Sequence, residues 1–207
     1  VISAVMDFSL NKNRITEVIP FKRDGEFENC AVESFSQKTR ALLKIQDGCN
    51  RFCSYCIIPY ARGRVRSKPV KEILKETQLM ALEGYKEVVL VGINLSAYGQ
   101  DIGMNLCDAI EAVCSVDGIN RVRLGSLEPE QMDECTILRL SKQDKLCPHF
   151  HLSLQSGCDR TLKRMGRHYS ANEYLSIVKN LNKHFNNVSI TTDVMVGFAG
   201  ETDEEFK

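Results

Sequence analysis

Three cysteines in the first half of the chain, Cys49, Cys53 and Cys56, follow the spacing C-x3-C-x2-C. One short loop with these gaps can place three thiolates around a corner of a [4Fe–4S] cube, with the fourth iron open to another ligand. A disulfide framework does not fit an odd number of cysteines. A zinc site needs a fourth ligand, and the first histidine of the chain is His149. The remaining alternative is three buried, inert thiols, but packing does not require this spacing.

The residues around these cysteines resemble the radical S-adenosylmethionine (SAM) superfamily, whose defining motif has an aromatic residue, here Tyr55, before the last cysteine. Within that superfamily the chain is similar to the tRNA methylthiotransferases from about residue 41 to residue 207. The resemblance implies that SAM binds the open iron and is cleaved to a 5′-deoxyadenosyl radical when the cluster is reduced. The segments that carry the resemblance are residues 44–49, 57–64, 152–157 and 196–202.

The composition favours a globular protein of the cytoplasm. Hydrophobic residues make up 43% of the chain, which is enough for a buried core. Nine cysteines are spread thinly without a signal-peptide pattern, which is typical of a reducing compartment. No apolar run reaches the roughly 18 residues that span a bilayer, so no membrane partner is expected. The formal net charge is zero, so the chain as a whole lacks the basic character of many nucleic-acid-binding domains.

Alternating strand and helix patterns begin at residue 41. Strands are expected to start near residues 42, 86, 120, 149 and 188, with helical patterns between them. Repeated right-handed βα units predict an α/β fold, namely a partial parallel (β/α) barrel of about five units. We interpret residues 41–207 as a radical SAM core that is truncated at its C-terminus, and residues 1–40 as a linker or the remnant of an upstream domain. A short hairpin at residues 24–25 is one interpretation of that N-terminal segment.

Ligand sites in parallel sheets lie at the C-terminal ends of the strands, and the resemblance assigns the residues found there to SAM. Gly92 and Asn94 end the second strand and are expected to contact the SAM amino group. Arg167 resembles a clamp for the SAM carboxylate, because a guanidinium binds a carboxylate through two hydrogen bonds. The alternative for each residue is an ordinary polar group at a strand end that bonds to a neighbouring loop.

The resemblance also implies contacts to the nucleoside part of SAM. Glu128 ends the third strand and is expected to bind the ribose or the amino group, and Gln155 ends the fourth strand and is expected to reach the ribose. The backbone of Ile58 is expected to pair with the adenine edge, and Tyr55 adds an aromatic face beside the cluster. Asp193 lies in the fifth strand, where it could face the interior of the barrel.

Other polar residues allow two interpretations each. The basic run at residues 60–68 could bind RNA phosphates, or it could be a solvated loop held by ion pairs. His149 and His151 could be polar groups of the barrel interior, but hydrogen-bonded structural histidines are favoured. The other cysteines of the core are expected to pack as small apolar residues: Cys107, Cys114, Cys135, Cys147 and Cys158.

The resemblance implies a transferase that replaces an adenine C–H with a methylthio group on a hypermodified adenosine next to the anticodon of tRNA. Residues 123–129 look like those of the enzymes that act on threonylcarbamoyladenosine. The alternatives are isopentenyladenosine in tRNA, a ribosomal protein, or a non-catalytic iron–sulfur module. The expected partners are tRNA and an electron donor that the sequence does not identify.

The ends of the chain predict a piece of a longer protein. A capping box at residues 202–205 predicts a helix that the chain would not complete. The resemblance implies a second [4Fe–4S] cluster in an N-terminal domain that is missing here. We therefore expect this segment alone to bind one cluster but not to insert sulfur into tRNA.

Overall fold

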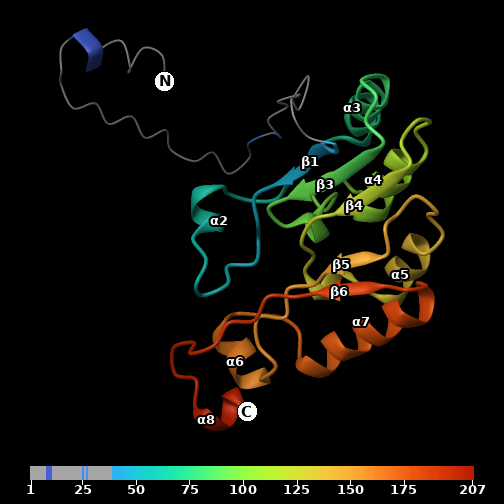
Figure 1. Ribbon diagram of the computed structural model, residues 1–207. Helices are drawn as coiled ribbons and strands as arrows, with labels where there is room; N and C mark the ends of the chain where they lie inside the picture. Colours follow the sequence, from blue (N-terminus) through green and yellow to red (C-terminus); the bar gives the residue numbers. More distant parts are fainter. Residues whose placement is uncertain (1–7, 11–24, 26, 28–38) are drawn as a thin grey trace.

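Five parallel strands form the centre of the fold in the computed structural model, which describes residues 8–10, 25, 27 and 39–207. One ladder joins β1, β3 and β4, and a second joins β5 and β6. A parallel bridge between Leu127 and Leu152 links the two ladders, so the strands follow one another in sequence order across the molecule (Figure 1). This arrangement confirms the predicted βα repeat. The strands are β1 (Ala41–Asp47), β3 (Glu87–Gly92), β4 (Arg121–Leu124), β5 (His149–His151) and β6 (Ser189–Thr191).

Four helices, α3, α4, α5 and α7, carry the apolar faces that the sequence predicts. Each helix packs on a neighbouring helix: α3 contacts α4, α4 contacts α5, and α5 contacts α7, while α3 and α4 also contact β1 and β4. The core between helices and strands contains fully buried side chains such as Ile73, Val88 and Ile110. The helices are α3 (Val70–Leu82), α4 (Leu106–Cys114), α5 (Glu134–Leu140) and α7 (Ala171–His184).

Helix α7 begins with a capping box. The Ser170 hydroxyl accepts a hydrogen bond from the backbone N–H of Glu173, and the Glu173 carboxylate accepts one from the backbone N–H of Ser170 at 2.7 Å. The same pair of bonds between Thr202 and Glu205 starts the short helix α8 (Asp203–Phe206). The capping box predicted at residues 202–205 is therefore confirmed.

Several short elements follow the strands and were not predicted. The cysteine loop leads into α2 (Ile58–Ala61) and β2 (Arg66–Ser67), and β2 pairs antiparallel with β1. Two 3₁₀ turns, η1 (Leu95–Ala97) and η2 (Pro129–Gln131), follow β3 and β4. Helix α6 (Asp159–Arg164) follows β5. These elements surround the C-terminal ends of the strands, where a ligand site is expected.

The last strand is less covered than the others. Ser189 and Thr191 of β6 are exposed, and the residues Val194 and Val196 beyond it are 57% and 65% exposed. In the described part of the chain, no helix combines the length and the apolar composition that crossing a bilayer requires. The hairpin considered at residues 24–25, and residues 1–40 in general, lie almost entirely outside the described residues.

Candidate functional site

The cysteine loop leaves β1 through a turn that requires glycine. Gly48 has a φ of 73°, and a Cβ at this position would overlap the backbone carbonyl of Arg64. The next residue, Cys49, donates its N–H to the carbonyl of Gly63 at 2.9 Å. The return of the chain after α2 therefore lies directly against the start of the loop, which fixes the first cysteine at the end of β1.

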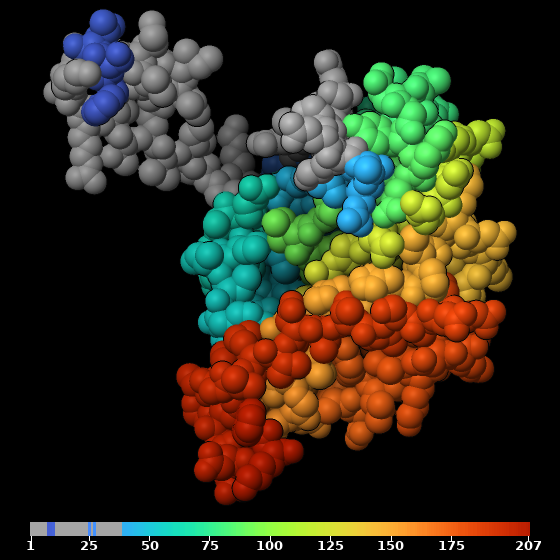
Figure 2. All heavy atoms as spheres, in the orientation of Figure 1, coloured from blue at the N-terminus to red at the C-terminus, as the bar shows by residue number. Residues whose placement is uncertain are grey.

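The middle of the cysteine loop is hydrogen-bonded to the C-terminal end of α6. Ser54 donates its backbone N–H to the carbonyl of Met165 and its hydroxyl to the carbonyl of Arg164, both at 2.9 Å. Tyr55 contacts the ring of Phe198 edge-on, with ring centroids 6.1 Å apart. Figure 2 shows the segment around residues 50–66 and the C-terminal segment beside each other at one end of the molecule.

The thiols of Cys49, Cys53 and Cys56 are free and half-buried. In residues 39–207 and the few described positions before them, no three Cys, His, Asp or Glu side chains converge on one point as a single metal ion would require. The donor set still suits an iron–sulfur cube, because each thiolate of a cluster binds a different iron. The loop therefore fits a [4Fe–4S] cluster better than a zinc ion.

Hydrogen-bond donors approach two of these sulfurs. The backbone N–H of Arg51 and the side-chain amide of Asn94 lie 3.4 and 3.6 Å from the Cys49 sulfur. The guanidinium of Arg167 lies 3.5 Å from the sulfur of Cys53. Burial raises the pKa of Cys53, and Arg167 opposes that shift because a cation favours the thiolate.

Arg167 and Glu128 form a buried ion pair at the centre of the site. The Arg167 guanidinium donates twice to the Glu128 carboxylate, and the side chains are only 4% and 20% exposed. Arg167 also donates to the hydroxyl of Tyr169 and to the carbonyl of Ser153, both at 3.3 Å. Burial raises the pKa of Glu128, while the attraction of Arg167 lowers it. The structure thus brings two predicted SAM residues together, but binds them to each other.

Gln46 of β1 holds the backbone that follows β3 through hydrogen bonds, although it was not among the expected site residues. It is fully buried, and its amide nitrogen donates to the carbonyls of Asp47 and Gly48 at 2.7 Å. Its amide oxygen accepts the backbone N–H of Asn94 at 2.7 Å. A Cβ on Gly92 would lie 2.8 Å from that oxygen, so the glycine leaves space for Gln46. In the sequence Gln46 shares its strand with two other polar residues, a lysine and an aspartate, so it gave no distinct signal.

Among the remaining expected SAM residues, Gln155 and Asp193 follow β5 and β6, whereas Ile58 begins α2. Gln155 has a φ of 64°, a conformation uncommon for a residue with a side chain, and its backbone pairs with Asp193 and Met195. The Asp193 side chain is 74% exposed and bonds to His151 at 3.2 Å. The carbonyl of Ile58 accepts the N–H of Arg62 at 2.7 Å within the turn of α2. Contacts of these residues with SAM stay predictions.

The two histidines of β5 are hydrogen-bonded, as favoured from the sequence. Both rings contact the hydroxyl of Thr191, with His151 at 3.0 Å and His149 at 3.3 Å. Burial lowers the pKa of His149 below its ordinary value, and the nearby Arg123 acts in the same direction. Among the other cysteines, Cys107 and Cys114 are buried as expected, but Cys135 is exposed.

The basic run after the cysteines is engaged in ion pairs. Arg62 and Arg66 contact the carboxylate of Asp47 at 2.5 and 3.5 Å, and Lys68 is buried against Glu76 at 2.5 Å. Burial favours the protonated form of Asp47, but hydrogen bonds from Arg62 and from a neighbouring lysine lower its pKa to about 2. The ion-pair interpretation therefore describes most of this run.

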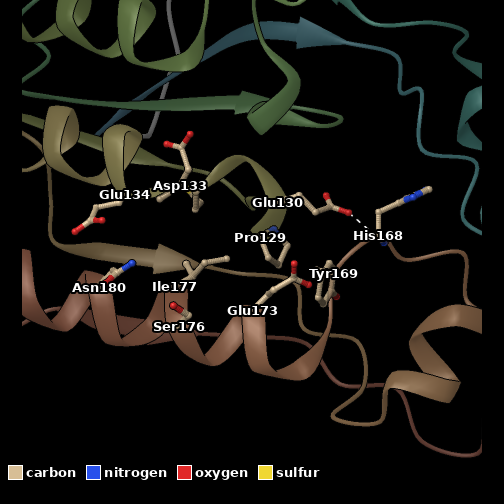
Figure 3. Close-up of a pocket in the computed structure, with 11 residues that line it drawn as sticks. Pro129, Glu130, Asp133, Glu134, His168, Tyr169, Glu173, Ser176, Ile177 and Asn180 are labelled. Carbon is tan, nitrogen blue, oxygen red and sulfur yellow. Dashed lines mark hydrogen bonds between the residues drawn. The ribbon is translucent and has the colours of Figure 1, made fainter.

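A pocket of about 320 Å³ lies between η2 and α7 (Figure 3). Its rim carries the carboxylates of Glu130, Asp133, Glu134 and Glu173. The backbone N–H of His168 donates to Glu130 at 3.2 Å, as the dashed line in Figure 3 indicates. This pocket lies beside the outer helices, whereas a smaller polar pocket adjoins the cysteine loop.

Comparison with known proteins identifies the family. The model of the radical SAM superfamily matches residues 43–207, which is most of the chain. The chain therefore belongs to the radical SAM superfamily, whose members use a [4Fe–4S] cluster and SAM. This confirms the superfamily and the fold that the cysteine spacing and the βα repeat predicted.

Two similar curated proteins are tRNA-modifying enzymes. A threonylcarbamoyladenosine tRNA methylthiotransferase from Thermotoga maritima is 43% identical over 84% of this chain and 40% of its own length. A tRNA-2-methylthio-N(6)-dimethylallyladenosine synthase from Clostridium tetani is 44% identical over 81% of this chain and 38% of its own length. The chain thus spans about two fifths of the length of these relatives.

Solved structures support the fold. A radical SAM methyltransferase from Kitasatospora setae, TsrM, superposes with a TM-score of 0.65 at 17% identity, over 80% of this chain and 32% of that one. The cobalamin-dependent radical SAM enzyme OxsB gives a TM-score of 0.60 at 14% identity, over 77% and 24%. At these identities the likeness concerns the fold alone.

Proposed function

We propose that this chain is the radical SAM core of a tRNA methylthiotransferase acting on threonylcarbamoyladenosine next to the anticodon. The observation that carries the proposal is the cysteine loop: three free thiols at the end of β1, with N–H donors beside Cys49 and Cys53. The names of the similar curated proteins support the reaction and the tRNA substrate.

Cys49, Cys53 and Cys56 would hold the cluster, which when bound supplies an electron to SAM on its open iron. Gln46 and Gly92 position Asn94 beside Cys49, and the Glu128–Arg167 pair lies beside Cys53. In this proposal a second [4Fe–4S] cluster elsewhere in the whole protein would hold the sulfur that is inserted, and the electron would come from an unidentified reductant. All eight cysteines of the described residues are free thiols, which supports a cytoplasmic location.

The choice between the two adenosine substrates rests on residues 123–129, because the relatives of both types match this chain almost equally. Incubation of the anaerobically reconstituted whole protein with dithionite, SAM and threonylcarbamoyladenosine-containing tRNA should give a methylthio nucleoside, measured by mass spectrometry. If product forms only on tRNA that contains dimethylallyladenosine, that nucleoside becomes the assigned substrate. Formation of 5′-deoxyadenosine without any methylthio product on tRNA would refute the proposal.

The cluster ligands have a direct test. Cys53→Ala should remove this cluster's share of the brown chromophore of the reconstituted whole protein, because three thiolates are needed to hold the cube. Cys135→Ala, in the exposed first turn of α5, is the matched control and should keep it. Retention of about four irons per core by Cys53→Ala, beyond those of any other cluster in the whole protein, would contradict the assignment.

A further inference from the structure

A small polar pocket of about 180 Å³ adjoins the cysteine loop. Four of its six lining residues carry carboxamides, one carries a guanidinium and one a methyl group. Its volume is below the roughly 300–1,000 Å³ of a typical whole-ligand site, so it suits a polar substituent rather than a complete nucleoside. The lining residues are Asn50, Arg51, Asn94, Ala97, Gln100 and Gln131.

The walls of this pocket are held by bonds from three separate parts of the fold. Arg51 is fixed by an ion pair with Glu130 at 2.6 Å, and the side chain of Asn50 accepts the N–H of Val65 at 3.3 Å. The η1 and η2 walls are joined where the Ser96 hydroxyl accepts the backbone N–H of Glu128 at 2.8 Å. The pocket is thus preorganised by the elements that also surround the cysteines.

One polar atom at this pocket lacks a partner. Asn94 is only 5% exposed, and in the described residues its side-chain oxygen accepts no hydrogen bond. Its amide nitrogen faces the sulfur of Cys49 at 3.6 Å. A buried carbonyl without a donor is costly, so a ligand that presents an N–H or O–H here would satisfy it.

We propose that this pocket binds the N6 substituent of the substrate adenosine and selects the threonylcarbamoyl group. This inference rests on the proposed function. Carboxamides supply both donors and acceptors, as the ureido group of that substituent requires. A dimethylallyl group makes no hydrogen bonds and would leave the buried carbonyl of Asn94 unpaired. A site built for hydrogen bonds rejects such an analogue strongly.

Of the lining residues only Asn94 was assigned to SAM from the sequence, so the test uses Gln131 and Gln100. Gln131→Met and Gln100→Met keep the length of each side chain but remove its hydrogen bonds. Gln78→Met, on the exposed side of α3, is the matched control. The reconstituted whole protein is titrated, without reductant, with anticodon stem-loop RNAs that carry threonylcarbamoyladenosine or unmodified adenosine.

Wild-type protein should prefer the threonylcarbamoyl RNA. Each pocket variant should lower that preference about 2- to 10-fold, the worth of one hydrogen bond, and Gln78→Met should leave it unchanged. Thermal melts identify a variant that fails to fold, in which case the other pocket variant decides.

Full preference in both folded pocket variants would overturn the inference. Loss of SAM affinity with unchanged RNA preference would also overturn it, because the pocket would then belong to SAM. If wild-type protein makes methylthio product while the variants keep their preference, only the pocket assignment fails. If wild-type protein makes no methylthio product on either modified tRNA, the proposed function fails, and the pocket assignment with it.

Discussion

Replacement of Arg167 by methionine tests how far the Glu128–Arg167 pair stabilises the site. The Arg167 side chain is 4% exposed, and its nitrogens contact Glu128, Tyr169, Ser153 and Cys53. Arg167→Met would leave the Glu128 carboxylate without its cation. Removal of one partner of a buried pair costs about 3–5 kcal/mol, because the other charge stays desolvated.

The loss should be visible in the melting temperature of the whole protein. For a core of this size, 1 kcal/mol corresponds to about 2–4 °C, so Arg167→Met should lower Tm by roughly 6–20 °C. Arg160→Met is the control, because Arg160 is 73% exposed in its ion pair with Glu205 and such pairs contribute about 0–1 kcal/mol. Adding Glu128→Gln to Arg167→Met should restore part of the lost stability, because no unpaired charge then remains.

The pH dependence of the effect has a definite sign. Burial already raises the pKa of Glu128, and loss of Arg167 should raise it further. A carboxyl with a raised pKa in the folded state contributes stability at low pH and loses it as pH increases. The destabilisation by Arg167→Met should therefore be larger at neutral pH than near the ordinary pKa of a glutamate. A Tm within the range of the Arg160→Met control at neutral pH would refute this reasoning.

The same variant tests the expected contact with SAM. If Arg167 also binds the SAM carboxylate, Arg167→Met should weaken SAM binding by about 1.5–3 kcal/mol, measured by equilibrium titration of folded protein. Unchanged SAM affinity together with weaker RNA binding would reverse the assignment.

Two further predictions concern the start of the site. The Asp47 pKa is lowered from 3.8 to about 2, so its contribution of about 2 kcal/mol is present above the ordinary pKa and is lost as pH falls toward the folded value. The stability gap between wild type and Asp47→Asn should close over that range in denaturant titrations, and a constant gap would contradict the ion-pair account. Gly92→Ala should cost about 1–3 kcal/mol, because the added Cβ would lie 2.8 Å from the Gln46 amide oxygen. Gly157→Ala, which meets nothing within 4 Å, is its control in the same melts; equal effects would show that Gln46 does not restrict position 92.

The long elements of the fold could be predicted because their residues repeat a period. Helix α3 and strand β3 show the helical and strand patterns over enough residues to be recognised, and α7 adds a capping box. The elements that were missed, such as β2 and α6, have 2 and 6 residues. They are too short for a period, and tertiary contacts decide their conformation.

The cysteines of the site were predictable, but the partners of the expected SAM residues were not. Local spacing identifies Cys53, whereas Arg167, which contacts it, lies 114 residues further along the chain. The bond between Arg167 and Glu128 spans 39 residues and depends on how β4 and α6 pack. Sequence patterns place such residues at strand ends, but they do not show which strand ends face each other.

The arginines around the cysteine loop show why a basic sequence run need not be an RNA-binding surface. Arg62 contacts Asp47, and Arg51 contacts Glu130. The buried Glu128–Arg167 pair is a third contact of this kind. Each pair joins the loop or its immediate contacts to a strand end, so these charges hold the site together. A phosphate would have to displace a carboxylate in order to bind there. If the whole protein binds tRNA as proposed, we expect other surfaces to supply most of that affinity, while these ion pairs hold the three cysteines of the loop in place.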